Sequence, residues 1–169
     1  NGSNAAQINT IPGISGPQLW YFRNGQGLEA MSFQVQLPHS WVEGTTIYPH
    51  LHWIPRGNNV AGNVEWNLDY SWANYDASTV QVFPAATTST VVASPASGRL
   101  VQNGHYITAL TTGNAGIDGT GKKISSVLIC RIWRNSDNAA DTYNEDAGVL
   151  FMDFHIQIDG FGSRETFVK

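Results

Sequence analysis

Residues 64–72 alternate strictly between apolar and polar side chains. In an extended strand successive side chains point to opposite faces of the sheet, whereas a helix would scatter the same residues around its axis. The apolar members of this segment are Val64, Trp66, Leu68, Tyr70 and Trp72. The alternation therefore predicts a β-strand that directs these five side chains into a core and the intervening polar side chains outward.

Shorter β-type runs are separated by Gly, Pro and Asn, which are typical of turns. We predict strands at residues 32–37, 46–54, 79–83, 90–94, 105–111, 125–134 and 150–158, with residues 19–22 as a candidate ninth strand. The 125–134 run is largely apolar, as expected of a central strand, and the 150–158 run alternates like 64–72. No segment has the 3.6-residue period of an amphipathic helix.

This series of short strands predicts an all-β fold, specifically a jelly-roll β-sandwich of about eight antiparallel strands. An immunoglobulin-like sandwich fits the number of strands almost as well. A length of 169 residues is that of one domain with a full core. Residues 1–18 are small and polar with several Gly and Pro, so we expect an N-terminal arm or loop there and a single jelly-roll domain over residues 19–169.

The charge content favours assembly with other subunits. Charged residues make up 13% of the chain, and the three lysines are Lys122, Lys123 and Lys169. Charged side chains are depleted where a surface is buried against a partner, so this composition predicts a homo-oligomer. A net charge of −4 without a basic stripe argues against contact with nucleic acid, and no apolar run reaches the roughly 20 residues of a membrane span.

Two loops and one cysteine contain residue types that can carry chemistry. Residues 116–123 approach the phosphate-binding loop pattern, but a strand and not a helix is predicted to follow them, so we interpret them as a glycine-rich loop. Residues 135–146 are acidic without calcium-loop spacing and are expected to form a solvated loop. The lone Cys130 excludes a disulfide within the chain and a zinc site built on several thiolates, and we expect it to be buried.

The strongest candidate site is the pair His50 and His52, whose side chains point to the same side of a strand. The segment Gly44 to His52 resembles the first half of the cupin metal motif, yet the glutamate that a cupin places a few residues later is missing. His155 would complete a site if its strand lies beside this one. Because Ile47, Leu51 and Trp53 look like core, the histidines should face outward, where an interface role is favoured over metal binding. Pro49 suggests an edge strand or a bulge.

Enzymatic motifs are otherwise lacking. The sequence contains no serine-nucleophile elbow of the Gly-x-Ser-x-Gly type. Glu65 and Asp69 share a strand face and are interpreted as its polar outside. Trp66, Tyr70 and Trp72 invite comparison with a sugar-binding platform, although their alternation favours core positions. We therefore expect no catalytic activity and no cofactor.

The segment Leu37-Pro38-His39-Ser40-Trp41-Val42-Glu43-Gly44-Thr45-Thr46-Ile47-Tyr48-Pro49-His50-Leu51-His52-Trp53 resembles one that recurs in uncharacterised structural proteins of bacteriophages and marine viral metagenomes. The resemblance continues at residues 66–74, 125–134 and 153–159, and it covers most of residues 37–169. It implies a virion structural protein with the nucleoplasmin-like or viral-coat jelly roll, assembled in the bacterial host cytoplasm with itself and with other virion proteins. That family offers no catalytic residues to carry over.

Three functional hypotheses follow. The first is the self-assembling virion protein. The second is a cupin-like metal-binding protein in which His50, His52 and His155 are the ligands. The third is a carbohydrate-binding module that uses exposed aromatic side chains. All three share one fold class, and a fold alone does not fix the function.

Overall fold

The structure is a computed structural model that describes residues 4–58 and 60–162. These residues form twelve strands and one short 3-10 helix. The strands are β1 (Asn4–Ala5), β2 (Gln7–Thr10), β3 (Gln18–Phe22), β4 (Leu28–Gln36), β5 (Tyr48–Pro55), β6 (Val60–Ala61), β7 (Val64–Ala73), β8 (Thr87–Ala93), β9 (Arg99–Leu100), β10 (Tyr106–Ala109), β11 (Val127–Asn135) and β12 (Ala147–His155); the helix is η1 (Thr112–Asn114). No helix in the described part of the chain is long and apolar enough to span a membrane.

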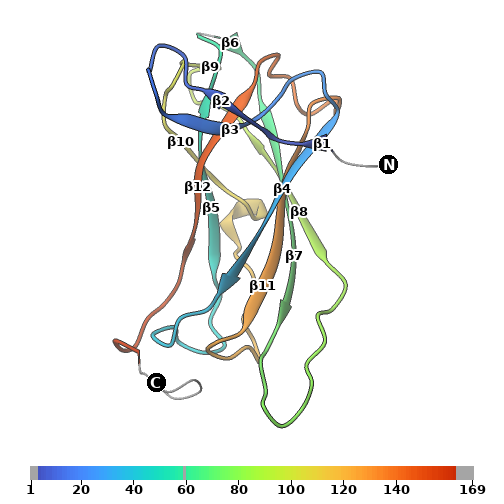
Figure 1. Ribbon diagram of the computed structural model, residues 1–169, viewed down its shortest axis with the longest axis vertical. Helices are drawn as coiled ribbons and strands as arrows, with labels where there is room; N and C mark the ends of the chain where they lie inside the picture. Colours follow the sequence, from blue (N-terminus) through green and yellow to red (C-terminus); the bar gives the residue numbers. More distant parts are fainter. Residues whose placement is uncertain (1–3, 59, 163–169) are drawn as a thin grey trace.

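Two five-stranded sheets make up the body of the molecule (Figure 1). The first has the order β1-β4-β11-β7-β8, and the second has the order β10-β5-β12-β3-β2. Strands β6 and β9 pair separately at one end. All pairs are antiparallel except β1 with β4, so the first sheet is mixed. The prediction of an all-β fold is confirmed.

Eight of the strands pair in a nested order. The innermost pair is β7 with β8, followed outward by β5 with β10, β4 with β11, and β3 with β12. Such nesting is what results when one long antiparallel hairpin is folded over on itself. Pairing of β12 with β5 and of β11 with β7 then joins the ribbon into two sheets. The central position of β11, between β4 and β7, agrees with its apolar sequence.

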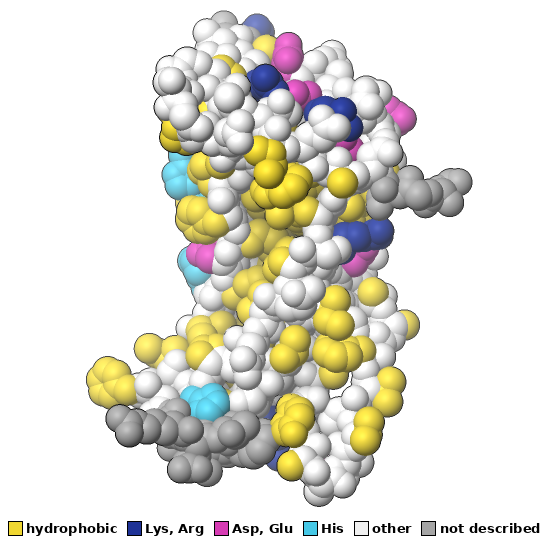
Figure 2. Space-filling view, in the orientation of Figure 1, with side chains coloured by type: hydrophobic (Ala, Val, Ile, Leu, Met, Phe, Trp, Pro, Cys, Tyr) yellow, Lys and Arg dark blue, Asp and Glu magenta, His cyan; other side chains and the backbone are white. Residues whose placement is uncertain are grey.

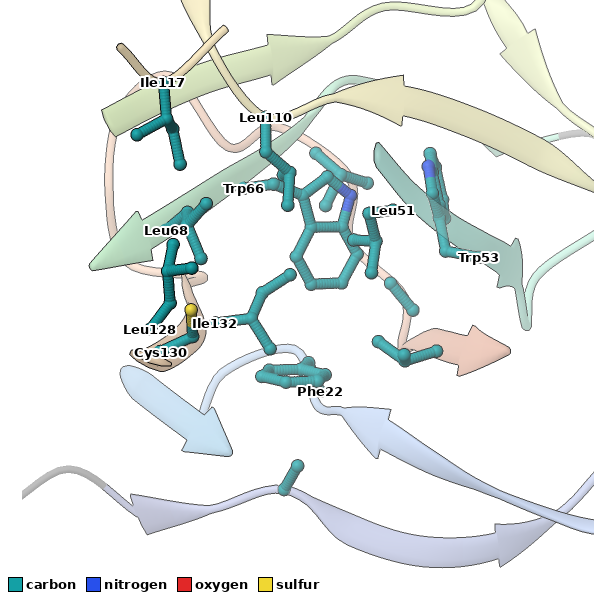
Figure 3. Close-up of a cluster of buried hydrophobic side chains, with 14 of the residues drawn as sticks. Phe22, Leu51, Trp53, Trp66, Leu68, Leu110, Ile117, Leu128, Cys130 and Ile132 are labelled. Carbon is teal, nitrogen blue, oxygen red and sulfur yellow. The ribbon is translucent and has the colours of Figure 1, made fainter. Parts of the chain in front are cut away.

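The core lies between the two sheets and is rich in tryptophan (Figure 3). The rings of Trp66 of β7 and Phe22 are nearly perpendicular with 5.3 Å between centroids, and the Trp66 ring lies 5.8 Å from that of Trp53 of β5. Edge-to-face pairs of this kind add to the stabilisation from burial alone. Cys130 of β11 is buried among these side chains as predicted, and burial raises the pKa of its thiol to about 12.

Strand β7 confirms the predicted core face but has a second buried face. Val64, Trp66, Leu68 and Trp72 are buried and Tyr70 is partly buried against the core. The prediction that the polar face is exposed was wrong for Glu65, which is buried together with its neighbour Asn67. The backbone N–H of Glu65 donates to the Asp141 carboxylate, and the side-chain amide of Asn67 donates to the Glu65 carboxylate. The loop that contains Asp141 therefore covers this end of the strand.

Two segments differ from the predicted strand map. Residues 79–83 form no strand, because β7 and β8 pair only from Tyr70 opposite Thr87 onward and leave the connection without a ladder partner. Val80 and Val82 in that connection are 90% and 81% exposed. Residues 4–10, expected within an arm or loop, instead contain β1 and β2, which pair with β4 and β3. The last part of the predicted domain, residues 163–169, lies outside the described residues.

The 135–146 loop is partly buried, which corrects the expectation of a solvated acidic loop. Asp141 of this loop lies under the surface and accepts two hydrogen bonds from Arg134, at 2.7 and 2.8 Å. Arg134 also donates to the carbonyls of Phe22, Tyr143 and Glu145. All five N–H donors of the guanidinium are thereby satisfied, as a buried cation requires.

The remaining loop and proline predictions have mixed outcomes. Residues 116–123 form a loop that is followed by a turn within residues 124–126 and then by β11, so no helix N-terminus is available there for a phosphate. Pro49 was predicted to mark an edge strand or a bulge. β5 is not an edge strand, because it lies between β10 and β12, and its pairing with β12 contains a register shift between Val149 and Phe151. Pro49 sits at the second position of β5, where its carbonyl accepts from the Leu110 amide.

Candidate metal centre on the outer face of the second sheet

Histidine side chains gather on the outer face of the second sheet, where β10, β5 and β12 lie side by side. Successive side chains along β5 point to opposite faces of the sheet. Leu51 and Trp53 point into the core, so His50 and His52 point to the outer face. The β5–β12 register places Asp153 opposite His50 and Phe151 opposite His52. On this side of the molecule Figure 2 shows histidine, acidic and hydrophobic side chains close together.

Asp153 lies at the centre of the cluster. Its Oδ2 atom is 3.0 Å from Nε2 of His155. Its Oδ1 atom is 3.5 Å from Nε2 of His52 and 4.0 Å from Nδ1 of His50. The rings of His50 and His155 are 4.4 Å apart between centroids. One carboxylate thus faces three imidazoles.

A fourth histidine extends the cluster toward β10. Nε2 of His105 lies 2.7 Å from Nδ1 of His52, so one of these two nitrogens donates and the other accepts. Phe151 stacks on the other side of His52, with 4.1 Å between ring centroids and an interplanar angle of 19°. His52 is therefore held on three sides, by His105, Phe151 and Asp153.

Burial within the cluster is uneven. The side chains of His50 and His52 are 13% and 12% exposed, whereas His155 at the end of β12 is 66% exposed. Nδ1 of His50 and Oδ1 of Asp153 are shielded from solvent and have no hydrogen-bond partner among the described residues. Their 4.0 Å separation is too long for a hydrogen bond between them.

The three histidines singled out from the sequence do come to one face, because β12 lies directly beside β5. The ligand atoms that lie within 4.8 Å of one another in the described residues, however, belong to His50, Asp153 and His155. His52 is directed at Asp153 and His105 instead. Sequence reasoning missed His105, which directly precedes β10, since only the pairing of Ile107 with His52 brings this part of the chain to His52.

The cluster lies outside the sandwich. The core side of β5 is filled by Leu51 and Trp53, so no site forms on that side of the strand. The histidines lie on the opposite face, as expected from the alternation along β5.

An apolar groove of about 580 Å³ forms a second notable surface, at the seam between the two sheets. Figure 2 shows hydrophobic side chains gathered across the middle of this face of the molecule. The groove is lined from β4 by Met31, Phe33 and Val35 and from β12 by Met152 and Phe154. These side chains are only partly buried against the core.

Backbone edges flank this groove on both sides. β3 pairs with β12 only at Ala147–Val149, and β1 pairs with β4 only at Glu29 and Ala30. No described residue pairs with the groove-side edge of β12 over 150–155 or of β4 over 31–36. The groove is thus bounded by two open strand edges.

The aromatic residues considered as a sugar platform are not available for that purpose. Trp66 and Trp72 are buried in the core, and Tyr70 is partly buried against it. Trp72 donates its indole N–H to Ser126 at 2.9 Å inside the protein.

No family model, curated protein or solved structure matches this chain.

Proposed function

We propose that this protein is a virion structural component of a bacteriophage-like virus, and that it self-assembles through a jelly-roll domain. In a jelly roll, eight strands form a nested antiparallel ribbon that wraps into two four-stranded sheets. The nested pairs β3 with β12, β4 with β11, β5 with β10 and β7 with β8 support this topology. In this proposal β1 and β2 are additions to its edges.

The apolar groove between β4 and β12 is the observation that carries the assembly role. Open strand edges beside exposed apolar side chains are surfaces that native proteins normally cover. We propose that an extended segment of a second copy occupies the groove. Such a segment would hydrogen-bond to the free edge of β4 or β12 and insert alternate apolar side chains between Phe33 and Phe154.

The surface composition supports a second copy over a charged partner. The groove lining contains one ionisable side chain, Asp153, among fifteen residues. Trp20 and Phe151 beside it are 42% and 51% exposed, although they are large and apolar. Burial of apolar groups is the main driving force for association. The groove is poor in charged residues and rich in apolar ones, which is the composition expected of a surface that another copy covers.

Sedimentation velocity of the purified chain at micromolar concentration tests the proposal. We expect an oligomer for the native sequence and a shift to monomer for Phe33→Lys, which places a charge in the groove. Gln36→Lys is the matched control, because Gln36 lies on the same strand but is exposed on its other face. Thermal unfolding would check that both variants fold.

A chain that remains strictly monomeric at this concentration would contradict the assembly role. Equal association of the Phe33→Lys and Gln36→Lys variants would locate the interface elsewhere. The virion assignment itself is tested by mass spectrometry of purified virus particles from the source of the gene and by the identity of the flanking genes.

A further inference from the structure

We propose that the outer face of the second sheet holds one divalent first-row transition-metal ion, coordinated by His50, Asp153 and His155. The proposal does not depend on self-assembly, because His50 and His155 lie outside the lining of the apolar groove and Asp153 is the one ligand that the two surfaces share. Two imidazoles and one carboxylate form a ligand set that suits zinc and its neighbours in the first row better than magnesium or calcium.

The spacing of the ligand atoms is compatible with a metal ion, which would replace the hydrogen bond between His155 and Asp153. The three atoms lie within 4.8 Å of one another. Ligands at 2.0–2.2 Å from a tetrahedral zinc ion are separated by roughly 3.3 Å from each other. Closing the cluster onto an ion therefore needs shifts of about an ångström, which the exposed His155 side chain at the strand end can supply.

The buried atoms without partners point to the same place. Nδ1 of His50 and Oδ1 of Asp153 are hidden from solvent, face each other at 4.0 Å and have no described hydrogen-bond partner. Buried polar atoms are usually satisfied, and these two differ from other buried atoms without partners in that they face each other and are both metal-ligating types. A cation between them would satisfy both atoms at once.

The sheet holds two of the three ligands rigidly. His50 and Asp153 are direct cross-strand partners, and β5 is paired on both sides. His52 approaches the Asp153 carboxylate at 3.5 Å and is itself fixed by His105 and Phe151. Outer partners of this kind orient a ligating carboxylate, so we assign His52 and His105 a positioning role.

Titration of the untagged, chelator-treated 169-residue chain with Zn²⁺, followed by calorimetry, tests the site. We expect saturable binding of one ion per chain and a zinc-dependent rise in the unfolding temperature. His155→Ala should weaken binding by more than about 100-fold, because loss of an outer partner alone costs about 10- to 100-fold. Since His155 is largely exposed, this variant should fold normally.

Two further variants make the test specific. His105→Ala should retain the ion with a smaller loss than His155→Ala, within the roughly 10- to 100-fold that removal of a positioning residue costs. His39→Gln is the matched control, because the fifth histidine bonds to Ser125 and takes no part in the cluster. Binding that survives His155→Ala but disappears in His105→Ala would overturn the assignment in favour of a His52–His105 pair.

Co²⁺ provides a spectroscopic readout of the same site. Replacement of zinc by Co²⁺ should give visible absorption bands for the native chain and the His39→Gln variant, and none for His50→Ala. Absence of stoichiometric binding by either ion would refute the proposal. The Phe33→Lys variant should bind zinc normally even if it no longer assembles, which separates failure of this site from failure of the assembly proposal.

Discussion

At the scale of single residues, Arg131 and Arg134 show how little a residue type says about its contribution. Both lie on β11 and both contact an aspartate. Arg131 is 41% exposed on the outer face beside Asp69, whereas Arg134 is 1% exposed on the inner face beside Asp141. An exposed pair is screened by water, while removal of one partner from a buried pair leaves a charge without compensation.

We therefore predict that Arg134→Met lowers the free energy of unfolding by about 3–5 kcal/mol, because Asp141 and three carbonyl groups lose their donor. The matched variant Arg131→Met should cost less than about 1 kcal/mol. Urea denaturation measures both. Similar losses in the two variants would show that the 135–146 loop does not depend on the buried pair.

Tyr143 makes the stability of the protein depend on pH in the alkaline range. Burial raises the pKa of Tyr143 to about 12 from its usual value of 10.0, despite the hydrogen bond from the Gly57 amide, which lowers it. Between these values the unfolded chain loses the phenol proton while the folded chain keeps it, so stability falls as pH rises through this window. Urea midpoints at pH 9 and about pH 11 should therefore differ less in Tyr143→Phe than in the native chain.

At the scale of elements, a predicted strand was correct where its segment has a neighbouring strand to pair with. The alternation over residues 64–72 identified the core face of β7, because that face is set by the strand itself. The same pattern misplaced Glu65, because the residue that covers it, Asp141, is distant in the sequence. Residues 79–83 have strand-like composition but no neighbouring strand, and a strand is stable only within a ladder.

The histidine cluster, like the faces of β7, could be predicted from the sequence only in part. The two-residue spacing of His50 and His52 indicates a shared face without knowledge of the fold. The addition of Asp153 and His155 depends on the β5–β12 register, and that of His105 on the β5–β10 register. Registers between strands more than fifty residues apart cannot be obtained from local periodicity.

The 74–86 connection provides a test at this scale. Its backbone lacks ladder partners and its Val80, Val82 and Phe83 side chains are exposed, so a protease should reach it before either sheet. We predict that limited chymotrypsin digestion cleaves first within residues 75–83. Mass spectrometry of the early fragments would identify the site, and first cleavage inside β7 or β11 would contradict the prediction.

At the scale of the whole molecule, the nested ribbon explains why the groove exists. β3 is short and covers β12 only at Ala147–Val149, so the seam stays open along the remaining length of β12. A longer β3 would close it within one chain. The proposed assembly role thus follows from the length of one strand, while the metal site depends on the long β5–β12 pairing on the other side of β12.

The single cysteine has a practical consequence for all of these measurements. Cys130 lies in the middle of β11 between the sheets, and its raised pKa keeps the thiol protonated. A thiol reagent should modify it only when the two sheets separate, so the labelling rate reports the opening equilibrium of the native chain without an introduced probe. Under native conditions we expect labelling slower than that of the urea-unfolded chain by the same factor as the unfolding equilibrium constant.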